Sequence, residues 1–301
     1  MSRFASHFLH SFLSLNGAQR YNCACFFTIH HSLGIPMETL QTSGALNVAS
    51  DAAIEAGKII AQSITQLDRI QISQKSRNEM VTEIDIVAEQ KIVAHLEESY
   101  PLFSIEAKQS GNKDRVSEFC WIIDPLNGTH NFIHGHPHCA VSISLRQRDD
   151  IVLAVVYDPL RNELFSARKG SGAQLDGRRI RVSETAKISD GLLGTGFPNR
   201  GDANTKPWLR TFALVLPRAQ TIHRSGCPVL DMAYVAAGRY DGFWQFGLEH
   251  WCTAAGSLLI KEAGGLICDI NGDSDLSKSG NLVAGNARTH EKLRQLVSHT
   301  G

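Results

Sequence analysis

The most informative segment of the chain spans residues 121–131 and reads Trp-Ile-Ile-Asp-Pro-Leu-Asn-Gly-Thr-His-Asn. Its apolar start predicts a buried strand that ends at the Asp124 carboxylate. Gly128 allows the backbone to turn there, and Thr129 supplies a hydroxyl beside the turn. A carboxylate at a strand end next to a glycine turn can hold a divalent cation and a phosphate. A strand followed by an Asx turn would carry the same residues, so the local chemistry leaves both interpretations open.

The composition around this segment is that of a globular protein. The chain has 301 residues, of which 43% are apolar and 20% charged, with 30 basic and 30 acidic side chains. A net charge of zero argues against a nucleic-acid binder held by counterion release. No apolar run approaches the roughly 18 residues of a membrane span. The 7 cysteines have no paired spacing, which favours a reducing cytoplasm over a disulfide framework.

The first 36 residues differ from the rest of the chain. They carry Arg3 and Arg20, many serines and no acidic residue, and the first acid of the chain is Glu38. This composition is typical of a transit peptide. Alternatively, translation begins at Met37 and the segment is an over-extended start. With either interpretation, we expect residues 1–36 to be an extension outside the fold.

Hydrophobic periodicity predicts that helices and strands are interleaved along the chain. The predicted helices cover residues 46–64, 86–96, 230–238, 253–263 and 288–297. The predicted strands cover residues 121–124, 140–145, 151–157, 163–167, 180–182, 243–246, 266–270 and 282–284. Hairpins accompany the crossovers, which indicates a layered mixed α/β sandwich and excludes a barrel or a helical bundle.

Several motifs in order along the chain resemble the inositol monophosphatase family, beginning with the metal-binding signature at residues 121–131. The others are Met80–Asp85, the stretch from Tyr100-Pro101 to Ser110-Gly111, Tyr157–Phe165, Asp231–Arg239, Gly247–Cys252 with Ala254-Ala255-Gly256, and Glu262–Gly265. The resemblance covers nearly everything after residue 40. It implies the αβαβα sandwich of inositol monophosphatases and fructose-1,6-bisphosphatases. Residues 37–180 would carry most metal and phosphate motifs, and residues 181–301 would complete the substrate site.

The resemblance also implies a chemistry. In this family, carboxylate-bound Mg²⁺ ions activate a water molecule for attack on a phosphate monoester such as inositol 1-phosphate. Asp124 matches the aspartate that bridges the metals, and Leu126 matches a position that ligates through its backbone carbonyl. Asp85 and Thr129 match the pair that holds and activates the water. Lys75 matches a basic position near the site.

Three of the family's metal-carboxylate positions carry other residues in this chain. They are Lys108, Asn127 and Cys252, and Gln109 replaces an acid beside the first of them. Mg²⁺ prefers carboxylate oxygens, and a unit charge about 4 Å from a divalent ion is repelled by about 8 kcal/mol at an effective dielectric near 20. We therefore expect a degraded Mg²⁺ site, in which the Lys108 ammonium occupies the metal position between Asp85 and Asp124.

The substrate wall implied by the family also departs from the pattern. Gln245 stands where a glutamate normally contacts the inositol hydroxyls, and Cys227 stands in the segment Gly226-Cys-Pro-Val229. Gly128 and Thr129 remain as substrate-binding positions. Cys252 is expected at a helix N-terminus, where the pKa of a thiol falls. Residues 253–258 contain no arginine for a cysteine phosphatase, which disfavours a catalytic thiol.

Three functions remain open at this point. The first is a pseudoenzyme kept as a partner-binding factor: bacterial members of the family also serve transcription antitermination and ribosomal RNA synthesis, which implies RNA polymerase and Nus factors as partners. The second is an active Mg²⁺-dependent phosphomonoesterase. The third is a zinc-binding variant that would draw on His130, His134, His136, His138, Cys139, His250 and Cys252. The resemblance implies a homodimer in each case, and the cysteine usage favours the cytoplasm.

Overall fold

The structure is a computed structural model that describes residues 37–76, 79–198, 203–276 and 279–298. The predicted extension, residues 1–36, lies outside the described residues. Residues 42–301 form one compact unit, and the fold described below is that of this unit.

The larger of its sheets has eight strands in the order β10-β9-β8-β7-β6-β5-β3-β4. All neighbours are antiparallel except β3 and β5, which run parallel. The strands are β3 (Ser104–Ala107), β4 (Gly111–Lys113), β5 (Phe119–Asn127), β6 (Ala140–Gln147), β7 (Asp150–Asp158), β8 (Glu163–Arg168), β9 (Gly172–Leu175) and β10 (Arg178–Arg179). The predicted strand at the 121–131 signature is β5, an interior strand of this sheet between β6 and β3.

The smaller sheet has five strands in the order β12-β11-β13-β15-β14. β11 runs parallel to both of its neighbours, whereas the other pairs are antiparallel. The strands are β11 (Leu192–Thr195), β12 (Thr221–His223), β13 (Gly242–Gln245), β14 (Leu266–Asp269) and β15 (Leu282–Gly285). A separate antiparallel pair, β1 (Ile72–Ser76) and β2 (Glu79–Thr82), precedes the larger sheet.

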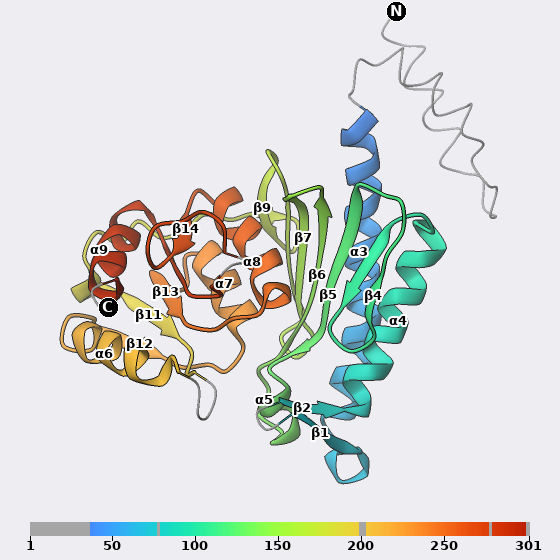
Figure 1. Ribbon diagram of the computed structural model, residues 1–301, viewed down its shortest axis with the longest axis horizontal. Helices are drawn as coiled ribbons and strands as arrows, with labels where there is room; N and C mark the ends of the chain where they lie inside the picture. Colours follow the sequence, from blue (N-terminus) through green and yellow to red (C-terminus); the bar gives the residue numbers. More distant parts are fainter. Residues whose placement is uncertain (1–36, 77–78, 199–202, 277–278, 299–301) are drawn as a thin grey trace, which may run out of the picture. The chain divides into compact units, whose positions relative to one another are not determined.

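Helices form three layers around these two sheets (Figure 1). From residue 44 onward, α3 (Met37–Ser63) packs with α4 (Glu83–Ser99) on one face of the larger sheet. α7 (Pro228–Ala236) and α8 (His250–Glu262) lie between the sheets and share a core with both. α6 (Thr205–Val215) and α9 (Ala287–Val297) cover the other face of the smaller sheet. The predicted αβαβα sandwich is confirmed.

Most of the predicted elements are also confirmed, with ends shifted by a few residues. The five predicted helices are α3, α4, α7, α8 and α9. The strand predicted at residues 180–182 is wrong, because β10 ends at Arg179 and the segment after it belongs to no strand. The apolar pattern of this segment reflects packing instead, because Ile180 and Val182 contact the core that contains α8. Within the described residues, no helix is long and apolar enough to cross a membrane.

Candidate functional site

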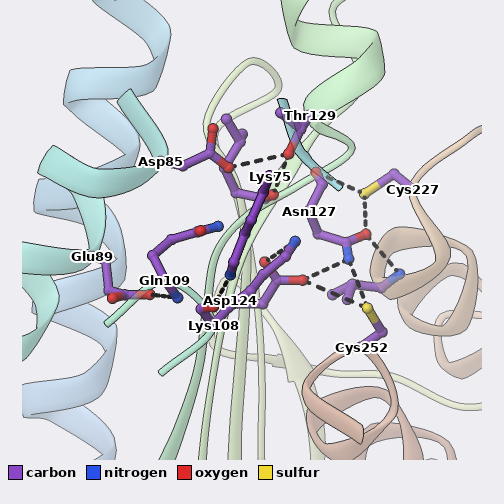
Figure 2. Close-up of polar contacts among 12 residues, drawn as sticks. Lys75, Asp85, Glu89, Lys108, Gln109, Asp124, Asn127, Thr129, Cys227 and Cys252 are labelled. Atoms are coloured by element: carbon purple, nitrogen blue, oxygen red, sulfur yellow. Dashed lines mark hydrogen bonds and ion pairs between the residues drawn. The ribbon is translucent and has the colours of Figure 1, made fainter. Parts of the chain in front are cut away.

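The residues predicted from the motifs meet at the end of β5 (Figure 2). A cavity of about 280 Å³ opens there, and its lining includes five predicted positions: Lys108, Gly128, Thr129, Gln245 and Cys252. Two further predicted residues, Asp85 and Asp124, are fully buried beside it. β5 and β6 pair irregularly between residues 124 and 127. This irregularity, together with the left-handed Gly128 (φ +91°), turns the chain into the short helix α5 (Thr129–Ile133).

The centre of the site is an ion pair between Lys108 and Asp124. Lys108 Nζ lies 3.0 Å from Asp124 Oδ1, and its side chain is only 12% exposed. Lys108 is brought there because its backbone N–H donates to Ile123 O, which extends the pairing of β3 with β5 by one residue. Lys75 Nζ in turn donates to Lys108 O at 3.0 Å. The expected contact of Lys108 with Asp124 is thus present.

The electrostatics of this pair keep the lysine charged. Burial by itself would lower the pKa of the Lys108 ammonium, but the nearby Asp124 carboxylate outweighs it and raises that pKa above its ordinary value. A buried charge of this kind is tolerated only when it is paired and hydrogen-bonded. Lys108 therefore places a permanent positive charge against the carboxylate that would bridge the metals.

Asn127 and Cys252 complete the surroundings of Asp124. Asn127 Nδ2 donates to Asp124 Oδ2 at 2.7 Å and lies 3.3 Å from Cys252 Sγ. Asn127 Oδ1 accepts from Cys227 Sγ at 3.2 Å and from the backbone N–H of Val229 at 3.3 Å. Both oxygens of Asp124 and both ends of the Asn127 amide are therefore engaged by protein groups.

The structure corrects two expectations about the cysteines. Cys252 does lie in the first turn of α8, but burial raises the pKa of its thiol, and the Asp124 carboxylate raises it further. The burial outweighs the helix end, so the thiol stays protonated. Cys227 is fully buried at the N-terminus of α7, and it contacts Asn127 from behind the cavity instead of forming the substrate wall.

Asp85 and Thr129 keep the neighbourhood that the motifs predict. Thr82 and Asp85 form the capping box at the start of α4, in which Asp85 Oδ2 accepts from Thr82 N at 2.8 Å and from Thr82 Oγ1 at 2.7 Å. Thr129 Oγ1 lies 3.1 Å from Asp85 Oδ1 and 3.1 Å from Leu126 O. Burial raises the pKa of Asp85, although these hydrogen bonds and the charge of Lys108 oppose the rise.

Sequence reasoning missed Glu89, which holds the loop that carries Lys108. Glu89 is 2% exposed and accepts from the backbone N–H groups of Gln109 at 2.7 Å and Ser110 at 2.6 Å. A signal for it exists in the sequence: Glu89 stands four residues after Asp85 and three before Ile92, on the apolar face of the predicted helix. A charged residue on such a face indicates a buried partner.

A second missed pair lies at the edge of the site. Glu106 in β3 is paired with His250 at the start of α8 and with Arg146 in β6 at 3.3 Å. The hydrogen bond from His250 holds the pKa of the Glu106 carboxyl below its usual range. The partners come from three elements far apart in the sequence, and no local pattern predicts their meeting.

The donor set does not fit the metals considered. Within the described residues, no group of three or more His, Cys, Asp or Glu side chains is placed to hold a metal ion, so the geometry gives the zinc variant no site. For Mg²⁺, the Asp124 oxygens face an ammonium and an amide N–H, both of which a cation would have to displace. Mg²⁺ requires oxygen ligands in near-octahedral geometry, whereas Asp124 is faced by hydrogen-bond donors of the opposite polarity.

The five-layer sandwich, with a pocket at the end of β5, defines the class of protein by its fold, which is that of the sugar phosphatases. The chain belongs to the inositol monophosphatase family, whose model matches residues 42–300. Members of this family generally depend on Mg²⁺.

Similar proteins include bacterial SuhB. The Nus factor SuhB of Pseudomonas aeruginosa is 46% identical over 253 residues, which cover 82% of this chain and 93% of that protein. The Nus factor SuhB of Escherichia coli is 43% identical over 244 residues, 81% and 91% of the two chains. The crystal structure of the extragenic suppressor protein suhB from Bartonella henselae is similar with a TM-score of 0.83 and 36% identity, over 85% of this chain and 99% of that one.

Proposed function

We propose that this protein retains the inositol monophosphatase fold as a partner-binding factor and has lost Mg²⁺-dependent phosphate hydrolysis. The single observation that carries the proposal is the buried ion pair of Lys108 with Asp124. A protonated lysine cannot ligate, and its charge opposes any divalent ion at Asp124. Asn127 donates a hydrogen bond to Asp124 where an aspartate would add a second negative charge.

The similarity to Nus factors indicates the kind of partner. Proteins named Nus factor SuhB are 43% to 46% identical to this chain over most of its length. We propose that this chain likewise works with the transcription machinery, in contact with RNA polymerase or Nus factors, as a homodimer in the cytoplasm. This role requires the fold and its surface, and it does not require a metal in the pocket.

One arrangement favours residual phosphatase activity as the second candidate. Asp85, Thr129 and the Leu126 carbonyl lie together as the family chemistry requires. Cleavage of inositol 1-phosphate would nevertheless need a cation to occupy the place of the Lys108 ammonium. The Lys108 ammonium at the cation position opposes hydrolysis more strongly than the three retained groups favour it.

Hydrolysis of inositol 1-phosphate with Mg²⁺ tests the catalytic half of the proposal. We expect the full chain to show no turnover above a metal-free control. The variant Lys108→Glu, Asn127→Asp, Cys252→Asp restores the carboxylates and should gain activity, together with a rise in unfolding temperature on addition of Mg²⁺. The variant Lys169→Glu, Asn112→Asp, Cys120→Asp makes the same changes outside the pocket and should gain neither.

Turnover by the unmodified chain would overturn the proposed loss of hydrolysis. The partner half has its own test, in which the full chain is mixed with purified RNA polymerase and Nus factors and analysed by size-exclusion chromatography. Co-elution with any of them is the expected result. Separate elution from all of them would overturn the partner role, whatever the phosphatase assay gives.

A further inference from the structure

A second and larger cavity lies on the outer side of the smaller sheet, between α6, α9 and the turn η2 (Ile188–Asp190). Its volume is about 900 Å³, at the upper end of the range of pockets that bind ligands. None of its lining residues belongs to the candidate site. We call it the α6–α9 groove and define it by Lys187, Ile188, Leu214, Arg218, Lys292 and Leu296.

The floor of the α6–α9 groove is apolar. Ile188 is 8% exposed and belongs to the core between α6 and α9, where Leu296 packs against the same core. Leu214 reaches the groove from the last turn of α6. An apolar floor of this kind binds aliphatic side chains, because their burial removes apolar surface from water.

The rim of the groove is basic. Among the described residues that line it, Lys187, Arg218 and Lys292 are basic and none is acidic. Arg218 Nη1 donates to Leu214 O at 2.7 Å, which fixes its guanidinium at the rim. Of the acidic residues nearby in sequence, Glu291 pairs with Arg294, Asp190 accepts from the neutral Ser189 Oγ, and neither lines the groove. The groove thus presents three positive charges above an apolar floor.

We propose that the α6–α9 groove docks an acidic segment of a partner protein that also carries leucine-like side chains. The proposal rests on the proposed function, since it supplies a surface for the partner. Charge complementarity selects an acidic occupant. The apolar floor favours a peptide over a nucleic-acid strand, whose phosphates would satisfy the rim and leave the floor uncovered.

Fluorescence anisotropy with a labelled peptide of glutamate and leucine tests this proposal on the full chain. Binding should weaken by about tenfold or more in the variant Lys187→Glu, Arg218→Glu, Lys292→Glu. The variant Arg69→Glu, Lys91→Glu, Arg178→Glu changes the net charge equally at exposed positions outside the groove, and it should bind like the wild type. Replacing the leucines of the peptide by serine should also abolish binding.

Equal binding by the groove variant and the wild type would overturn the proposal. So would tighter, groove-dependent binding of an oligouridylate RNA than of the peptide, since it would assign the groove to nucleic acid. The peptide assay needs neither phosphatase turnover nor RNA polymerase. If the groove variant still co-elutes with RNA polymerase or Nus factors, the groove proposal fails while the proposed function stands.

Discussion

Protein side chains contact both oxygens of the buried Asp124 carboxylate. Lys108 supplies the positive charge, and Asn127 supplies a neutral donor to the other carboxylate oxygen. Cys252 Sγ lies 3.7 Å from that oxygen and brings no charge of its own. The carboxylate therefore keeps a counter-charge in a fully buried position without any bound cation.

Removing that counter-charge should be costly. We expect Lys108→Met to lower the free energy of unfolding by about 3 to 5 kcal/mol, because it leaves a buried carboxylate without a partner. Lys169→Met is the matched control: its ion pair with Asp150 at 2.9 Å is largely exposed, and such pairs contribute about 1 kcal/mol or less. Urea unfolding of both variants measures the difference. Equal losses would contradict the central role of the buried pair.

Asp231 should make stability depend on pH. It lies in α7, where burial raises its pKa to about 7, despite the hydrogen bond from Ser225 and the charge of Arg224. The folded pKa exceeds the unfolded value near 4, so the protonated acid stabilises the fold at low pH. This contribution is lost as pH rises from about 4 to about 7.

The matching experiment compares the wild type with Asp231→Asn in urea at about pH 5 and about pH 8. The wild type should lose free energy of unfolding relative to the variant as pH rises, because only the wild type must ionise a buried carboxyl group. A difference that does not change with pH would show that Asp231 titrates normally in the folded protein.

Among the elements, the short helix α5 depends on the turn before it. Gly128 has φ +91°, and a Cβ atom at this position would lie 2.9 Å from the backbone oxygen of His138. Gly170 also has a positive φ, of +75°, but a Cβ there would meet nothing within 4 Å. The two glycines share a conformation and differ in the space around them.

We expect Gly128→Ala to destabilise the protein more than Gly170→Ala. The left-handed conformation costs either alanine about 1 to 3 kcal/mol, and only the first also meets a backbone atom at too short a distance. Thermal unfolding measured by circular dichroism distinguishes them. A loss at Gly170 as large as at Gly128 would mean that conformation alone, and not packing against His138, decides the cost.

The elements differ in how far the sequence predicts them. The long helices α3, α4 and α8 carry apolar stripes over several turns, and their periodicity is readable. Strands such as β4 and β12 have three residues each, which is too short for a period, and they exist because a neighbouring strand pairs with them.

The same distinction holds in the site. Asp85, Asp124 and Thr129 stand in motifs that match the family, and the resemblance implies that they lie together, as Thr129 and Asp85 do. The two hydrogen bonds that Glu89 accepts from the backbone after Lys108 join residues 20 and 21 positions apart. The pair of Glu106 with His250 spans β3 and α8. Such contacts depend on how elements pack, and a pattern within one element does not contain them.

At the scale of the whole molecule, the middle helical layer connects the two sheets. α7 and α8 share one core with Phe165 of the larger sheet and with Phe243 and Leu282 of the smaller sheet. The division of the chain near residue 180 into two halves stays a prediction. A core shared in this way indicates that neither half can bury its apolar face alone.

Residues 42–301 should therefore unfold in one cooperative transition. We expect tryptophan fluorescence and far-ultraviolet circular dichroism to give the same urea midpoint, as two-state unfolding requires. A fragment of residues 42–180 should bind a dye for exposed apolar surface and show no cooperative transition, because the face of its sheet that meets α7 and α8 would be uncovered. Two separate transitions in the full chain would contradict the shared core.

The network around Asn127 also limits how the protein can evolve. Its amide serves Asp124, Cys252, Cys227 and the backbone of Val229 at once. Restoring an aspartate there first would place two carboxylates side by side, and restoring a glutamate at Lys108 first would remove the charge that Asp124 needs. Either of these two single changes should lower stability before a cation can bind. A carboxylate at either position alone is therefore unfavourable, and the network favours changes that occur at both positions together.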